Sequence, residues 1–123
     1  MKNHDDEIDF STQEALELER LEIEESQART SDDWFTLGIN AFLHGAFQKA
    51  IDCFDHVLDL DPKNARAYAN RGDVHYECGE YDEALNDYEM AVFCGSQEAV
   101  SLRDELKAEI ALLKKRTQKE NDI

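Results

Sequence analysis

The sequence predicts an all-α fold, a solenoid of two helical hairpins flanked by one helix on each side. Three observations support it: an internal repeat, glycine and proline at the expected turns, and an amphipathic stretch after the repeat. Two stretches match each other 34 positions apart, which is the period of a stacked two-helix unit. The matched pairs are Trp34 and Tyr68, Gly38 and Gly72, Gly45 and Gly79, Phe47 and Tyr81, Ala50 and Ala84, Ile51 and Leu85, and Phe54 and Tyr88.

An acidic N-terminal arm over residues 1–30 comes first, with a helix predicted over about 12–28. Ser11 and Glu14 have capping-box spacing at its start. Its apolar side chains form a narrow stripe, and such a helix is marginal unless it packs on something. Three roles are open: a packing helix beside the first repeat, a detachable lid, or a segment that orders on a partner.

The first repeat covers about residues 31–64. Its first helix is predicted over 33–44 and ends at Gly45, because glycine adopts the left-handed conformation at little cost. Its second helix is predicted over 48–60, and Pro62 cannot easily continue it. The candidates for the N-cap of the first helix are Ser31 and Asp32.

The second repeat covers about residues 65–98 and follows the same plan. Its helices are predicted over 65–78 and 82–94, with Gly79 and Gly95 as turns. In both repeats a glycine on the first helix and an alanine on the second would allow close approach, with an aromatic ring filling the space beside them. Trp34 and Tyr68 are expected to be core anchors.

The order Trp34-x-x-Leu37-Gly38, then Ala50-x-x-x-Phe54, then Pro62 resembles the tetratricopeptide repeat family. This resemblance implies a helical solenoid that acts as a scaffold by binding other proteins. The second repeat departs from the family pattern and is more polar, as terminal repeats often are. The departures are His75 in place of a tyrosine (Ala41 in the first repeat), Arg71 in place of Leu37, and Ser96 in place of Pro62.

A capping helix and a basic tail are predicted over residues 99–123, with Ser96 as the N-cap. Its apolar residues recur every three or four positions, which puts them on one helical face. The helix is longer than a repeat helix, so its outer half, with Leu112, is expected to extend beyond the repeats. The apolar face consists of Ala99, Leu102, Leu106, Ile110 and Leu113, and the basic cluster of Lys114, Lys115, Arg116 and Lys119.

Composition excludes several classes of function. The 29 acidic and 13 basic residues give a net charge of −16, which disfavours nucleic acid and anionic membranes as partners. No apolar run reaches the roughly 20 residues of a membrane span, and we expect a cytoplasmic protein. The three cysteines and four histidines show no metal-ligand spacing, and no catalytic motif is present. We therefore predict no enzyme activity, no cofactor and no metal site.

The resemblance implies that the first helix of each repeat lines the partner-binding groove. One subfamily grips the C-terminal carboxylate of chaperone tails with Lys and Asn on the first such helix. Phe35 and Ile39 stand at those two positions here, and Asn70 with Arg66 does not rebuild that clamp. The predicted groove residues are Phe35, Ile39, Phe42, Leu43, Arg66, Asn70, Asp73, Tyr76 and Glu77.

The predicted function is a non-catalytic adaptor or co-chaperone that binds a protein or peptide segment of apolar and basic character. The four apolar groove residues are either core covered by the arm or an open strip for an apolar partner. One alternative is a small acidic secretion-type chaperone that holds an apolar effector segment. Another is a structural assembly subunit whose groove is filled by its own flanking helices. Two repeats form a small domain, so a homodimer is a further alternative.

Overall fold

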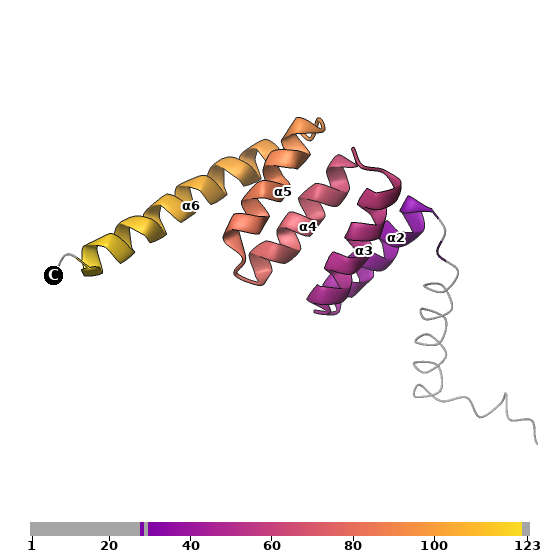
Figure 1. The fold of residues 1–123 in the computed structure, drawn as a ribbon, viewed down its shortest axis with the longest axis horizontal. Helices are drawn as coiled ribbons and strands as arrows, with labels where there is room; N and C mark the ends of the chain where they lie inside the picture. Colours follow the sequence, from indigo (N-terminus) through magenta and orange to yellow (C-terminus); the bar gives the residue numbers. More distant parts are fainter. Residues whose placement is uncertain (1–27, 29, 122–123) are drawn as a thin grey trace, which may run out of the picture.

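The structure is a computed structural model that describes residues 28 and 30–121 (Figure 1). The described part holds five helices and no strand, so the all-α solenoid is confirmed. The predicted helix over 12–28 falls, apart from residue 28, outside the described residues. The helices are α2 (Ser31–Leu43), α3 (Phe47–Leu60), α4 (Ala65–Glu77), α5 (Tyr81–Phe93) and α6 (Glu98–Asn121).

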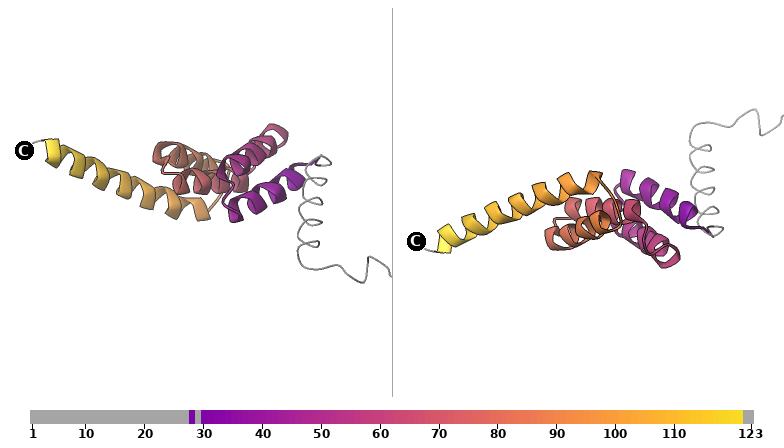
Figure 2. Two further views of the ribbon diagram at one scale, coloured as in Figure 1. Left: turned by 90° about the horizontal axis from the view of Figure 1, so that it is seen from below. Right: turned by 90° about the horizontal axis from the view of Figure 1, so that it is seen from above.

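The helices stack in chain order as two antiparallel hairpins followed by a single long helix. Helix α2 packs on α3 and α4 packs on α5, while α3·α4 and α5·α6 contacts join the units. Figure 2 shows α2, α4 and α6 on one side of the stack and α3 and α5 on the other. The side formed by α2, α4 and α6 is therefore a continuous surface that crosses both repeats.

Helix α2 begins at Ser31, two residues earlier than predicted from the sequence. Thr30 is its N-cap, and the Thr30 hydroxyl accepts a hydrogen bond from the Asp33 N–H at 3.1 Å. The Asp33 carboxylate accepts in return from the Thr30 N–H at 3.2 Å. The prediction of Ser31 or Asp32 as the cap was wrong, because only Thr30 has an acid three residues later that completes this capping box.

The two glycine turns have the same geometry, as the repeat predicts. Gly45 and Gly79 both have a φ of +76°, a conformation that residues with a Cβ rarely adopt. The N–H of each glycine donates at 3.0 Å to the carbonyl three residues earlier, on Phe42 and on Tyr76. Identical turns 34 residues apart confirm the predicted register of the two repeats.

Close helix packing inside each hairpin depends on a glycine that faces an aromatic ring. A Cβ at Gly38 would lie 2.8 Å from Cε1 of Phe54, and a Cβ at Gly72 would lie 2.8 Å from Cε1 of Tyr88. Such distances are shorter than any van der Waals contact, so the ring fills the space that a side chain would take. Ala50 and Ala84 are fully buried beside these contacts, which confirms the predicted role of the small residues.

Helix α6 extends far past α5, as predicted. The Ser96 hydroxyl accepts from the Ala99 N–H at 3.1 Å and caps the start of the helix. Ala99 and Leu106 are buried, and Leu102 and Ile110 pack beside Leu106. With 24 residues, α6 is about 36 Å long, against about 20 Å for the 13-residue α5. Its outer half therefore projects beyond the other helices of the stack (Figures 1 and 2).

Candidate functional site

The predicted groove residues occupy two helices that contact each other across the same surface, α2 and α4. The Arg66 guanidinium lies over the Phe35 ring, 4.6 Å from its centre, and joins the two rows of side chains. At the other end of α4, the Tyr76 hydroxyl reaches Glu109 on α6. These contacts define a surface over α2, α4 and α6, called the groove below.

The α2 end of the groove is apolar and only partly open to solvent. Phe35 packs edge-on against the buried Phe54, with ring centres 5.7 Å apart, and Phe42 packs against Phe47 at 5.8 Å. Ile39 is also half-buried against the core, whereas Leu43 is 74% exposed. Contacts with the core of the first repeat thus bury part of the strip, and Leu43 is its open part.

The α4 end of the groove is polar, and two tyrosine hydroxyls hold its carboxylates. Tyr88 on α5 donates to Asp73 at 2.7 Å. Tyr76 donates to the Glu109 carboxylate, with oxygen–oxygen distances of 3.0 and 3.3 Å. Of the other two predicted residues, Asn70 is half-buried and Glu77 is exposed.

A hollow of about 240 Å³ opens between α4, α5 and α6 at this polar end, and we call it the acidic hollow. Two predicted groove residues line it, Asp73 and Tyr76. Its α6 wall was not predicted from the sequence, although Glu105 and Glu109 stand four residues apart beside the apolar stripe of that helix. The lining residues are Asp73, Tyr76, Tyr88, Leu102, Glu105, Leu106 and Glu109.

The environment of the acidic hollow shifts the titration of its groups. Burial raises the pKa of Asp73, the hydrogen bond from Tyr88 opposes that rise, and the Glu77 charge adds to it. The hydrogen bond to Glu109 raises the pKa of Tyr76. Burial, followed by the bond to Asp73, raises the pKa of Tyr88 well above its usual range. Both hydroxyls therefore stay protonated at neutral pH and act as donors.

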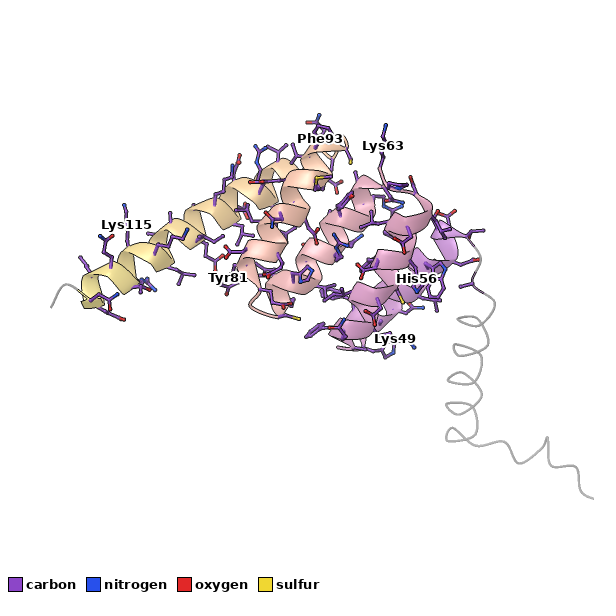
Figure 3. The ribbon with its side chains drawn as sticks, viewed as in Figure 1. Lys49, His56, Lys63, Tyr81, Phe93 and Lys115 are labelled. Carbon is purple, nitrogen blue, oxygen red and sulfur yellow. The ribbon has the colours of Figure 1, made fainter. Side chains whose placement is uncertain are left out.

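A second hollow lies outside the groove, between the start of α5 and the outer half of α6, with a volume of about 550 Å³. Ile110 and Leu113 give it an apolar wall, and Leu112, which precedes Leu113 on α6, is 58% exposed. Figure 3 shows Tyr81 at the start of α5 and Lys115 on the part of α6 that extends beyond it. The predicted basic cluster is fully on this exposed part of α6.

The chemistry of the described residues gives no sign of a reactive centre. Among them, no three His, Cys, Asp or Glu side chains lie close enough together to hold a metal ion. Cys53 is buried, while burial and the Glu80 and Glu77 charges raise the pKa of the exposed Cys78 thiol, which lowers its thiolate fraction. No helix in the described part is both long enough and apolar enough to cross a bilayer.

Comparison with known proteins finds similarity to tetratricopeptide repeat proteins. A family model described as TPR repeat matches residues 42–79. The chain is 35% identical over 52 residues to the human small glutamine-rich tetratricopeptide repeat-containing protein beta, covering 42% of this chain and 17% of that protein. It is 34% identical over 62 residues to Hsp70-Hsp90 organizing protein 2 of Arabidopsis thaliana, covering 50% of this chain and 11% of that protein. The chain thus spans less than a fifth of the length of each of these two relatives.

Two solved repeat domains show the same arrangement of helices. The first TPR of Spaghetti (RPAP3), bound to the HSP90 peptide SRMEEVD, superposes with a TM-score of 0.64 and 24% identity, covering 70% of this chain and 72% of that one. The Sgt2 TPR domain from Aspergillus fumigatus superposes with a TM-score of 0.63 and 26% identity, covering 68% of this chain and 57% of that one. Together with the 34-residue period and the paired glycine turns, these matches confirm the resemblance of the chain to the tetratricopeptide repeat family.

Proposed function

We propose that the protein is a non-catalytic binding module, of the adaptor or co-chaperone type, that holds a segment of a partner protein in the groove. The observation that carries this proposal is the change in character along the groove. Its α2 end presents the exposed Leu43, and its far end presents the acidic hollow. A segment that carries both apolar and basic side chains matches the two ends, since apolar contact and opposite charge both favour association.

An acidic chaperone tail fits this groove poorly. The peptide in the RPAP3 structure, SRMEEVD, ends in three acids among its last four residues. In this chain the carboxylates of Asp73, Glu105 and Glu109 line the hollow, and like charges across an interface are repelled. We therefore place this groove with binders of basic and apolar segments, despite its similarity in fold to that domain.

The test is a selection of phage-displayed random peptides on the immobilised full chain, followed by affinity measurement on variants. Enriched peptides are expected to combine Lys or Arg with large apolar residues. Leu43→Asp should weaken their binding at least tenfold, because a charge enters the apolar contact. Leu60→Asp is the matched control, since Leu60 is also exposed but lies on α3. Enrichment of peptides with acidic C-termini, or equal effects of both variants, would contradict the proposal.

A second candidate is a structural assembly role through the outer half of α6. The observation in its favour is the larger hollow there, in which Leu113 and Lys114 of α6 face an acidic wall at the start of α5, while Leu112 is exposed on the same part of α6. Light scattering over a range of protein concentrations distinguishes the two. Assembly would be supported if the mass of the native chain rises with concentration while the variant Leu112→Ser/Leu113→Ser stays a monomer.

A further inference from the structure

We propose that the acidic hollow is a binding site for one basic side chain, arginine or lysine, of the partner segment. This inference rests on the proposed function and adds the chemistry of one position in the bound segment. The site lies between α4, α5 and α6, so it requires the second repeat and the capping helix together.

The walls of the acidic hollow suit the shape of a long basic side chain. Leu106 is almost completely buried, and it forms the floor together with the half-buried Leu102. The Tyr76 and Tyr88 rings line the same space. Arginine and lysine have an aliphatic stem that packs on apolar surface and a charged head that needs polar partners, and their cations also attract aromatic faces. One hollow offers all of these surfaces.

The charged residues that line the hollow are all acidic. Three carboxylates line it, those of Asp73, Glu105 and Glu109, and no Lys, Arg or His is among its lining residues. The tyrosine hydroxyls donate hydrogen bonds to two of these carboxylates but bring no positive charge. Asp73 is partly desolvated and feels the Glu77 charge as well, and both effects raise its pKa. A cation from outside would compensate these charges in a partly dry site.

The first repeat shows that these polar groups are not needed to build the fold. The positions 34 residues before Asp73, Tyr76 and Tyr88 are Ile39, Phe42 and Phe54, all apolar. A Cβ at Gly38 would nevertheless lie 2.8 Å from the Phe54 ring, the same distance as from a Cβ at Gly72 to the Tyr88 ring. The second repeat therefore adds two hydroxyls and a carboxylate to an unchanged packing frame. This addition is what a polar ligand at this position would require.

A metal ion is a weaker match for the same carboxylates. Metals such as Ca²⁺ need several oxygens at about 2.3–2.6 Å from one point. The described residues contain no group of His, Cys, Asp or Glu that is arranged in this way. A guanidinium or ammonium group instead donates several hydrogen bonds in different directions, so it reaches carboxylates on α4 and on α6 at the same time.

The experiment compares N-acetyl-arginine amide with N-acetyl-citrulline amide, which has nearly the same shape but no charge. The full chain is titrated with each at equal ionic strength, and NMR signals of Tyr76, Tyr88, Leu102 and Leu106 are followed. We expect saturable shifts with the arginine probe at millimolar concentration and at least tenfold weaker binding of the citrulline probe. Equal responses to both probes, or no saturable shift with arginine, would overturn the inference.

Two variants locate the effect in the hollow. Glu105→Gln removes a lining charge and is expected to weaken the arginine probe about tenfold, whereas Glu120→Gln, the same change near the exposed end of α6, should leave it unchanged. Equal affinities for these two variants would also overturn the inference. Selected peptides that still depend on Leu43 in that case would leave the proposed function standing. Arginine binding in the hollow without any selected peptide would instead refute the proposed function alone.

Discussion

Arg71 and Asp87 form an ion pair inside the second repeat at the two positions where the first repeat has Leu37 and Cys53, both buried. Two nitrogens of the guanidinium bind the Asp87 carboxylate at 2.7 and 2.9 Å, and a third binds Asp55 on α3 at 2.7 Å. Asp87 is only 4% exposed. The charged pair thus stands where the first repeat has two buried apolar side chains, and with Asp55 it links α4 to both α3 and α5.

The buried pair predicts an asymmetric response to mutation. Asp87→Ala should destabilise the fold by about 3–5 kcal/mol, because it leaves the Arg71 charge in a partly buried site with only Asp55. The double variant Arg71→Leu/Asp87→Cys restores the residues of the first repeat and should lie close to the native stability. Chemical denaturation followed by circular dichroism measures both. A double variant as unstable as Asp87→Ala would show that the ion pair itself stabilises the repeat. The cost of an unpaired buried charge would then not explain the single variant.

The small packing residues give a second prediction. Ala84 is fully buried, so Ala84→Glu places an unpaired charge between α4 and α5 and should cost several kcal/mol, enough to unfold a domain this small. Ala108→Glu is the matched control, because Ala108 is exposed on α6. Thermal melts of the two variants test the register. An unchanged melting temperature for Ala84→Glu would be incompatible with the packing described here.

Asp73 gives a prediction about pH. Its pKa in the folded chain is raised above the ordinary 3.8, first by burial, so the folded state binds this proton more tightly than the unfolded chain does. The ionised Asp73 therefore lowers stability at neutral pH, and its protonation returns that stability as the pH falls through the raised pKa towards 3.8. Asp73→Asn has no such titration.

The measurement is the free energy of unfolding of the native chain and of Asp73→Asn from neutral pH down to mildly acidic pH. The stability of Asp73→Asn relative to the native chain should be greatest at neutral pH and should decrease as the pH falls. Contributions from other titrating groups largely cancel in this difference. A relative stability that increases towards acidic pH would mean that the Tyr88 hydrogen bond, which favours the ionised form, dominates instead.

Charge on the repeats gives a prediction about rates. Residues 34–98 carry 12 acidic and 4 basic side chains, and the acidic hollow is at one end of the groove. A basic segment should associate faster at low ionic strength, because salt screens the attraction that steers it, with a Debye length of about 10 Å at 0.1 M. Stopped-flow association of a selected peptide measures this. Equal association rates at low and high salt would assign recognition to apolar contacts alone.

The register of the fold was predictable from sequence because glycine and proline mark its turns. Gly45 and Gly79 have the same positive φ, and each predicted helix of the repeats ends within two residues of its observed end. The cap of α2 was missed because Thr30, Ser31 and Asp32 are all good cap residues, and only the reciprocal bond with Asp33 decides between them.

The groove was less predictable, because its walls come from helices that are distant in sequence. The repeat pattern places Phe35 and Phe42 on the inner face, but only the positions of α3 and α4 show how far they are buried. Glu105 and Glu109 belong to a helix outside the repeat pattern, so no family position identifies them. Their place in the acidic hollow depends on how α6 crosses α4 and α5.

The most direct test of the account is an NMR map of where a selected peptide touches the full chain. The groove predicts that backbone shifts concentrate on α2, α4 and the first half of α6, with large changes at Leu43, Tyr76 and Glu105. Residues on the outer side, such as Asp59 on α3 and Glu89 on α5, should stay unchanged. Shifts confined to α3 and α5, or to the outer half of α6, would contradict the groove as the binding site.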